Sequence, residues 1–180
     1  MKHKIIYSLS ILVMFASGLF AQERFALGVV GTRFGNIGSE NKLTKIENPF
    51  GYGVVASYRL TQEFAVVLTG EYFKDNMQNI PGKEQDFRGH LSTFVSPVSS
   101  EDLHPYLSAG IVYTYRKYEY STASSSKESE GVINGRFGLG VDYRLVSNLF
   151  LNLDLGLYND GMSIVGWSSS LGLRVNTALF

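Results

Sequence analysis

The sequence predicts an all-β fold, an eight-stranded antiparallel up-and-down transmembrane β-barrel. Three observations predict it. The 180-residue chain is rich in strand formers and turn formers, with 12 Phe, 11 Tyr and 19 Gly, and no segment beyond the N-terminus has a helical period. Apolar and polar residues alternate over segments of about ten residues. The connections between these segments alternate between tight turns and longer polar loops, as in barrels that span a membrane.

Eight segments show the alternation that places successive side chains on opposite faces of a strand. They run from Arg24–Phe34, Phe50–Leu60, Phe64–Lys74, Phe87–Ser96, Pro105–Tyr118, Val132–Leu145, Leu149–Tyr158 and Ser163–Phe180. The connections after the second and sixth segments are tight, and the one after the fourth is moderate. Those after the first, third and fifth are longer and polar, and only the last, 159–162, is short on that side.

The seventh segment, LFLNLDLGLY, shows the two faces most clearly. All five of its leucines occupy odd positions from Leu149 to Leu157, and polar or small residues occupy most of the even ones. The same parity gives the other segments one apolar and one polar face, except the first, where either parity mixes apolar and small residues. The polar faces carry the candidate site residues Glu71, Arg88, His90, Arg136, Asp142, Asp154 and Arg174.

The N-terminus predicts export. Lys2 and Lys4 precede an apolar run that extends to about Phe20, and the small residue Ala21 follows. This pattern is typical of a secretory signal peptide over residues 1–21, which leaves one barrel domain over 22–180. Since the chain has no cysteine, it has no disulfide, no thiolate metal site and no lipoprotein anchor. The formal net charge is zero, which gives no indication of a nucleic-acid partner.

Alternation alone does not decide which face points inward. A soluble, lipocalin-like barrel would turn the apolar set toward a ligand cavity and the polar set toward water. The polar faces, however, are rich in Gly and Ser beside their charges, which suits the crowded interior of an eight-stranded barrel. By parity, nearly every charged residue in the middle of a strand also lies on the polar face. On a lipid-facing surface, an Arg or Lys at mid-membrane would cost about 2–4 kcal/mol. We therefore expect lipid outside and a packed polar lumen inside.

Aromatic residues gather near the strand ends, as expected for girdles at two membrane interfaces. On the tight-turn side they are Tyr58, Phe64, Tyr143 and Phe150, and toward the longer loops they are Phe50, Tyr72, Phe87, Tyr113, Tyr115, Tyr158 and Trp167. The chain also ends on Phe180 at the close of a strand, which can pair with the first strand and leave no open edge.

Four features of the sequence carry a resemblance to a known family: the signal peptide, the strand count, the segment HPYLSAGIVYTY that begins at His104, and the terminal Phe180. With these features the chain resembles the small eight-stranded outer-membrane β-barrel proteins. This group includes the OmpA transmembrane domain and OmpX. The resemblance implies an outer-membrane location, contact with outer-membrane lipid, and recognition of the C-terminal strand by the barrel assembly machinery. It does not imply an activity. One departure is that Leu179 and the other outward residues of the last strand are out of phase with Phe180.

The charged residues of the polar face could in principle form an active or conducting site. An eight-stranded interior is filled by its own side chains, so a network that fixes strand register is the simpler interpretation, and a wide pore is not expected. Within that network, the hairpin geometry sets Glu71 opposite Arg88 as a buried ion pair. His90, Ser92 and Glu71 also permit a lipid-hydrolase hypothesis, which their direction toward the lumen disfavours. We expect no metal site, no cofactor and no catalysis.

The serine-rich loop Ser121–Glu130 offers a different possibility. With Tyr118, Tyr120 and Lys127 it could extend the sheet beyond the membrane and present an edge to a surface partner, although a solvated, tolerant loop is the simpler interpretation. The sequence thus predicts a monomeric outer-membrane barrel with a structural or adhesin-like role. A secreted or periplasmic soluble barrel that binds an apolar ligand is the main alternative, and an outer-membrane lipid hydrolase is a weaker one.

Overall fold

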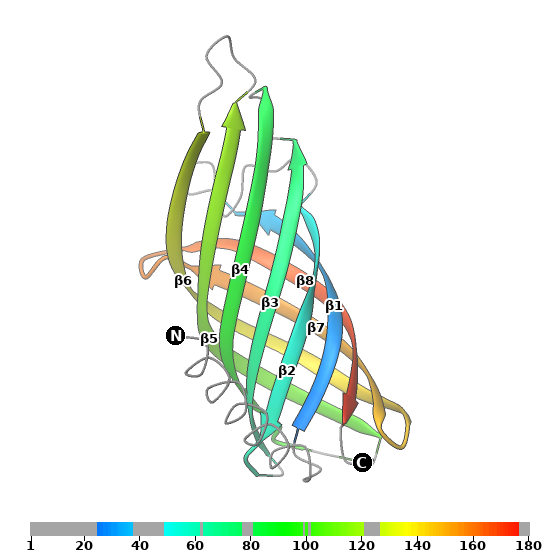
Figure 1. Cartoon of the computed structure of the whole chain (residues 1–180). Coiled ribbons are helices and arrows are strands. Elements are labelled where there is room, and N and C mark those ends of the chain that lie inside the picture. The colour runs from blue at the N-terminus through cyan, green and yellow to red at the C-terminus, as the bar shows by residue number, and fades with distance from the viewer. Residues whose placement is uncertain are drawn as a thin grey trace, which may run out of the picture.

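The computed structural model is a closed β-barrel of eight antiparallel strands (Figure 1). The structure describes residues 25–37, 49–61, 63–76, 81–98, 100, 102–120 and 127–176. The strands are β1 (Phe25–Asn36), β2 (Phe50–Arg59), β3 (Phe64–Asn76), β4 (Gly82–Val95), β5 (Leu103–Tyr120), β6 (Lys127–Val146), β7 (Leu149–Asn159) and β8 (Ile164–Asn176). The predicted fold class is confirmed.

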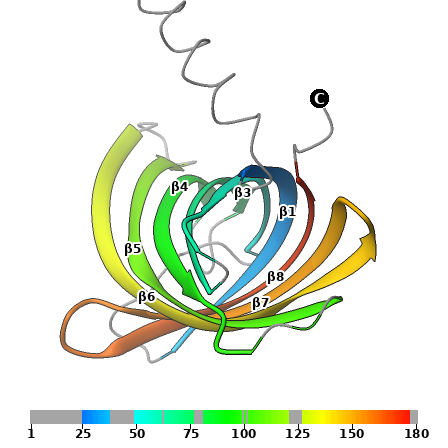
Figure 2. The same ribbon diagram turned by 90° about the horizontal axis from the view of Figure 1, so that it is seen from below.

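Closure comes from the pairing of the first strand with the last. Each strand pairs with its sequence neighbour, and β1 also pairs with β8 over eleven residues, with Val29 opposite Leu173. Figure 2, the view from below, shows the strands curving around the interior of the barrel. Because every strand has two partners, the backbone donors and acceptors in the closed part of the barrel are satisfied within the sheet. At the long-loop end, residues 127–134 of β6 pair with β5 alone. No helix among the described residues is long and apolar enough to cross a membrane.

The side chains alternate between an apolar outer wall and a polar, tightly packed interior. In β7, Leu153 and Leu155 are 48% and 55% exposed, whereas Asp154 between them is 7% exposed. The first strand, whose parity the sequence left open, follows the same rule, with Leu27 and Val29 outward and Val30 and Thr32 inward. The alternation therefore has the inverse sense of a soluble barrel, in which the large apolar side chains line the interior.

The prediction that Phe150 and Tyr158 belong to the outer aromatic girdles is wrong. Phe150 and Tyr158 are 5% and 1% exposed and lie in the interior. The reason is the alternation itself, because both are at even positions of β7 and share the inward face with Asp154. The other aromatics of the two predicted girdles that are exposed in the structure, such as Phe64 and Tyr143 at one end and Phe50 and Phe87 at the other, lie on the outer wall.

The strands on one side of the barrel extend further than the sequence predicts. β4 begins at Gly82 rather than Phe87, and β6 begins at Lys127 rather than Val132. β3 to β6 consequently rise above the other strands at the long-loop end (Figure 1). At the opposite end, His104 belongs to β5 rather than to a turn. The predicted signal peptide (1–21) and Phe180 lie outside the described residues.

Candidate functional site

The structure places all seven predicted polar residues in the barrel interior. Six of them are buried and Asp142 is half-buried; the buried ones are Glu71, Arg88, His90, Arg136, Asp154 and Arg174. They do not form one site. Hydrogen bonds and ion pairs divide them into three groups that follow one another from the short-turn end of the barrel to the long-loop end.

The first group joins four of the predicted residues through one continuous chain of contacts. Arg174 pairs with Asp142, and Arg136 pairs with Asp154. The Asn152 amide links the two pairs, because its Nδ2 donates to Asp142 Oδ1 at 2.7 Å and to the Tyr106 hydroxyl at 2.8 Å. The Tyr106 hydroxyl in turn donates to Asp154 Oδ2 at 3.1 Å. This chain crosses from β8 to β6, β7 and β5, so it fixes the relative positions of four strands.

The second group is centred on Glu71. His90 Nε2 lies 2.8 Å from Glu71 Oε2, and the Thr32 hydroxyl donates to Glu71 Oε1. Thr32 Oγ1 is also 3.0 Å from the Ser170 hydroxyl. These contacts connect β3 and β4 to β1 and β8 across the barrel, so they tie the closing seam to the opposite wall.

The third group corrects one prediction. Glu71 and Arg88 are direct partners in the β3–β4 register, as expected, but they do not form the predicted ion pair. Arg88 Nη2 instead pairs with Asp86 Oδ2 at 2.8 Å, and both side chains are fully buried. The guanidinium turns toward the long-loop end and stacks 3.8 Å from the centre of the Phe34 ring. Stacking on Phe34 and pairing with Asp86 both stabilise the buried guanidinium, while the Glu71 carboxylate lies against His90.

An aromatic cluster closes the lumen beside Arg88. The ring of Phe34 lies edge-on to Phe73 with 4.9 Å between centroids, and its centroid is 5.3 Å from that of Tyr158. Val112 and Val165 complete this buried cluster. These side chains and the Arg88–Asp86 pair are almost fully buried, so they pack the barrel interior at this level.

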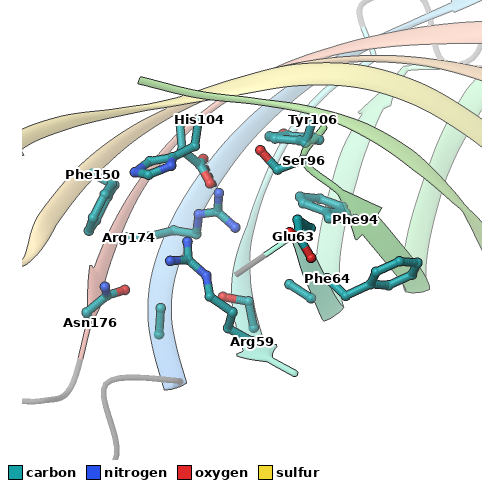
Figure 3. Close-up of a pocket in the computed structure, with 14 residues that line it drawn as sticks. Arg59, Glu63, Phe64, Phe94, Ser96, His104, Tyr106, Phe150, Arg174 and Asn176 are labelled. Carbon is teal, nitrogen blue, oxygen red and sulfur yellow. Dashed lines mark hydrogen bonds and ion pairs between the residues drawn. The ribbon is translucent and has the colours of Figure 1, made fainter. Parts of the chain in front are cut away.

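Two small cavities, each lined by both charged and apolar side chains, lie between this cluster and the short-turn end. One of about 60 Å³ opens near the short-turn end between Arg59, Arg174 and His104 (Figure 3). A second, of about 50 Å³, lies deeper, beside Glu71 and Arg136. Pockets for organic ligands are typically 300–1,000 Å³ and mostly apolar, so neither is suited to the apolar ligand of a lipocalin-like barrel.

Several residues of the network were missed by the sequence analysis. Asp86 has the same parity as Arg88, but the predicted strand began at Phe87 and left Asp86 in the loop. Tyr106 and Asn152 were on the correct face, yet only charged residues were taken as candidates. A rule that includes uncharged polar residues of inward parity, and that extends strands into polar loops while parity holds, would have found all three.

The β5–β6 hairpin carries the predicted surface candidates. Tyr118 is buried at the inner side of this hairpin, where its hydroxyl donates to Glu130 Oε1 at 2.5 Å. Arg116 Nη1 lies 2.8 Å from the same oxygen. Burial and the Glu130 carboxylate raise the pKa of the Tyr118 phenol, so it remains a neutral donor. Tyr118 therefore supports the hairpin from within.

The other two candidates lie nearer the hairpin tip. The Tyr120 hydroxyl donates to Glu128 Oε2 at 3.3 Å. Lys127 is the first residue of β6 and is paired in register with Glu119. Both therefore belong to a regular two-stranded extension rather than to the serine-rich loop itself.

The residues of the hydrolase hypothesis lie in the lumen. His90 directs Nε2 to Glu71, and Ser92 is on the same face of β4, 5% exposed. The buried aromatic cluster lies inside the barrel, between these residues and the long-loop end. Among the described residues, no group of three or more His, Asp or Glu side chains could hold a metal ion.

Comparison with solved structures agrees with this architecture. Neisserial surface protein A (NspA) aligns with a TM-score of 0.64 and 15% identity over 84% of this chain and 96% of that one. OprG, an outer membrane protein from Pseudomonas aeruginosa, aligns with a TM-score of 0.64 and 14% identity over 84% and 94%. Ail, the attachment invasion locus protein of Yersinia pestis, in complex with a heparin analogue, aligns with a TM-score of 0.56 and 16% identity over 84% and 96%.

These neighbours are small eight-stranded outer-membrane barrels, and this chain has their fold. No model of a known protein family matches the sequence. No curated protein matches it either. The likeness is therefore one of architecture, carried by strand number, closure and the inverted alternation of side chains.

Proposed function

We propose that the protein is an integral outer-membrane barrel with a packed lumen, whose role is structural or adhesive. The observation that carries the proposal is the inverted sidedness of the wall. Leu107, Ile111 and Leu139 are each more than half exposed on its outside, while arginines and carboxylates are buried within. A continuous apolar surface of this extent is far larger than soluble monomers expose, and lipid is the medium that suits it.

Export and assembly follow from the same proposal. The basic and apolar N-terminus acts as a signal peptide over residues 1–21, and the C-terminal strand is recognised by the barrel assembly machinery, as in the OmpA and OmpX group. The barrel is proposed to be a monomer, which is supported by the absence of a free strand edge in its closed part.

The β5–β6 hairpin supports the adhesive part of the proposal. β5 and β6 have 18 and 20 residues, whereas a tilted strand crosses a membrane with about 9–11. The excess projects at the long-loop end and is braced from within by Arg116, Tyr118 and Glu130. A rigid projecting hairpin can contact another surface with little loss of conformational entropy. Ail, one of the structural neighbours, is an attachment protein by its name.

We propose no catalytic role for His90, Ser92 and Glu71. A lipid ester outside the wall cannot reach side chains that point into the lumen, where His90 and Ser92 are buried. If purified protein hydrolyses lipid or ester substrates and the His90→Ala variant does not, this part of the proposal is wrong.

Cell fractionation with heat-modifiable gel mobility tests the membrane proposal. The protein should be recovered with outer membranes and should migrate faster before boiling than after it, because a closed barrel resists detergent until heated. Recovery in the soluble fraction with a single mobility would contradict the proposal and favour the secreted or periplasmic alternative.

A trimmed hairpin tests the adhesive role. Removing 117–129 and joining Arg116 to Glu130 through Asn-Gly preserves the cross-strand register and the Arg116–Glu130 ion pair. Cells that display the trimmed protein should adhere less to one another and to cultured cells, with unchanged heat-modifiable mobility. Equal adherence of trimmed and full-length protein would leave the barrel with a structural role alone.

A further inference from the structure

A hollow in the outer wall lies where two outward-facing glycines sit side by side. Gly70 of β3 is paired directly with Gly89 of β4, and a Cβ atom on either would meet no atom within 4 Å. Inward glycines differ, because a Cβ at Gly28 or Gly53 would clash with the backbone of the neighbouring strand. The barrel's own packing therefore does not require glycine at positions 70 and 89. They lie in a shallow, open hollow of the outer wall of about 670 Å³.

Aromatic side chains border this hollow toward the long-loop end. They form one cross-strand row over four strands, Tyr52, Tyr72, Phe87 and Tyr115. The rings are in contact, with 5.9 Å between the centroids of Tyr52 and Tyr72 and 4.9 Å between those of Tyr72 and Phe87. Val54 and Tyr113 flank the glycines in their own row, so the lining is almost entirely apolar.

Three lysines lie directly beyond the aromatic row. Lys74 and Lys117 share the next outward cross-strand row, and Lys83 is in the row after it. All three are exposed and have outward parity. Among the described residues of these two rows, the one acid with outward parity is Glu119, which is opposite Lys83 in register. The surface therefore combines an apolar hollow, an aromatic border and a net positive charge in consecutive rows of the same strands.

We propose that this surface binds an anionic phospholipid, with an acyl chain over Gly70 and Gly89 and the phosphate among Lys74, Lys83 and Lys117. The inference rests on the proposed membrane location. The order of the rows matches that of a lipid at the bilayer interface, where aromatic rings lie at head-group level and lysines reach the phosphates. Glycine in a strand often marks a bulge, a bend, or a place where a ligand or another backbone approaches closely. Gly70 and Gly89 have no neighbouring backbone within 4 Å of a Cβ, which leaves room for a ligand.

A second copy of the chain suits this surface less well. A two-fold dimer about the membrane normal would bring the same patch of both copies together. The three lysines of each copy would then lie at the same height and repel one another. A phosphate complements that charge, so the lipid is the favoured occupant.

Lipid titration followed by native mass spectrometry tests the proposal. The purified full-length protein, delipidated in detergent, is titrated with phosphatidylglycerol and with phosphatidylcholine of identical acyl chains. Phosphatidylglycerol should bind more tightly, and each lysine removed in a Lys74→Gln, Lys83→Gln and Lys117→Gln series should weaken its binding roughly fivefold, since a basic residue near an anionic surface contributes about 1 kcal/mol. Phosphatidylcholine binding should change little in this series.

Filling the hollow gives the second arm. Gly70→Leu with Gly89→Leu should weaken both lipids, and heat-modifiable mobility verifies that this variant folds. One control alters the outer wall elsewhere: Ala109→Leu enlarges an exposed position lower on β5. This variant should bind like the wild type.

Three results would overturn the lipid site. The first is equal affinity for the two lipids. The second is a preference for the anionic lipid that persists after all three lysines are replaced. The third is that the leucine variants abolish dimers of the protein and leave lipid binding unchanged. Inorganic phosphate at the same concentration should not compete, and full competition would mean that the lysines bind free phosphate alone. Failure of the protein to insert into vesicles would overturn both this site and the membrane proposal, whereas insertion without lipid preference would overturn the site alone.

Discussion

Arg136 shows how a single buried charge is accommodated in the lumen. Its guanidinium pairs with Asp154, donates to Ser108 Oγ at 3.1 Å and lies against Gly156, where a Cβ would meet it. The interior offers little water, so a buried charge that loses its partner costs far more than an exposed one. We therefore expect a large loss of stability when one member of a buried ion pair is removed and the other charge stays behind.

We expect Arg136→Met to lower the free energy of unfolding by about 3–5 kcal/mol, because it leaves the Asp154 carboxylate buried and without its cation. Urea unfolding in lipid vesicles measures this change. Arg33→Gln is the matched control, since Arg33 is exposed on the outer wall, and it should change the free energy by less than about 0.5 kcal/mol. Similar effects for the two variants would contradict a stabilising lumen network.

Glycines of opposite parity should respond oppositely to the same substitution. Gly28→Ala should lower the free energy of unfolding by about 1–3 kcal/mol, because the new methyl group clashes with the Leu173 carbonyl and the Arg174 side chain. Gly70→Ala meets open space and should raise stability by roughly 0.5–1 kcal/mol, because alanine loses less backbone entropy on folding. Denaturant titration of the two variants side by side checks the contrast, which a tolerant Gly28 would refute.

Parity predicts which residues enter the lumen better than it predicts their partners. All seven predicted residues of the polar face lie inside, because the period of two is a property of the backbone. The Glu71–Arg88 pair failed although its register was right. An arginine can reach several carboxylates from one position, and its choice of Asp86 depends on the Phe34 ring, which comes from another strand and has no signal in the local sequence.

At the scale of the element, turns and strand ends are where sequence and structure differ most. The bounds of β7 agree to within one residue, because Leu149–Leu157 alternate without interruption. β4 and β6 each begin five residues earlier than predicted. Their first residues are polar on both faces, so they look like loop, and only pairing with the neighbouring strand makes them β-structure.

The β7–β8 turn provides a prediction of pH dependence. Asp160 Oδ1 accepts from the backbone amides of Met162 at 3.0 Å and Ser163 at 2.9 Å, and these bonds lower the pKa of its carboxyl from the ordinary 3.8. A lowered pKa in the folded state stabilises the fold above the unfolded pKa, and this contribution is lost as the pH falls through the folded pKa. Asp160→Asn should therefore be less stable than wild type at pH 7 and equally stable once the carboxyl is protonated. Unfolding midpoints measured from pH 7 down to pH 2 check this, and a difference that grows on acidification would contradict it.

At the scale of the whole molecule, the order of strands and their closure follow from local rules. Eight alternating segments joined by short connections can pair in sequence order and close on themselves with no crossover. Composition could not decide whether the apolar face points in or out. The small residues of the polar face indicated that this face points inward. Inward glycines such as Gly53 and Gly140 lie where a side chain would clash with the adjacent strand or with Tyr106.

Lipid should surround the apolar wall, and the fluorescence of the single tryptophan is a direct test of this arrangement. Trp167 has outward parity in β8, is paired with Leu157 and is 37% exposed. When the full-length protein is reconstituted in vesicles, its emission should be strongly quenched by phospholipids brominated on their acyl chains and little affected by iodide in the water. Equal emission in brominated and ordinary vesicles, with quenching by iodide, would show that the wall faces water and would contradict the account.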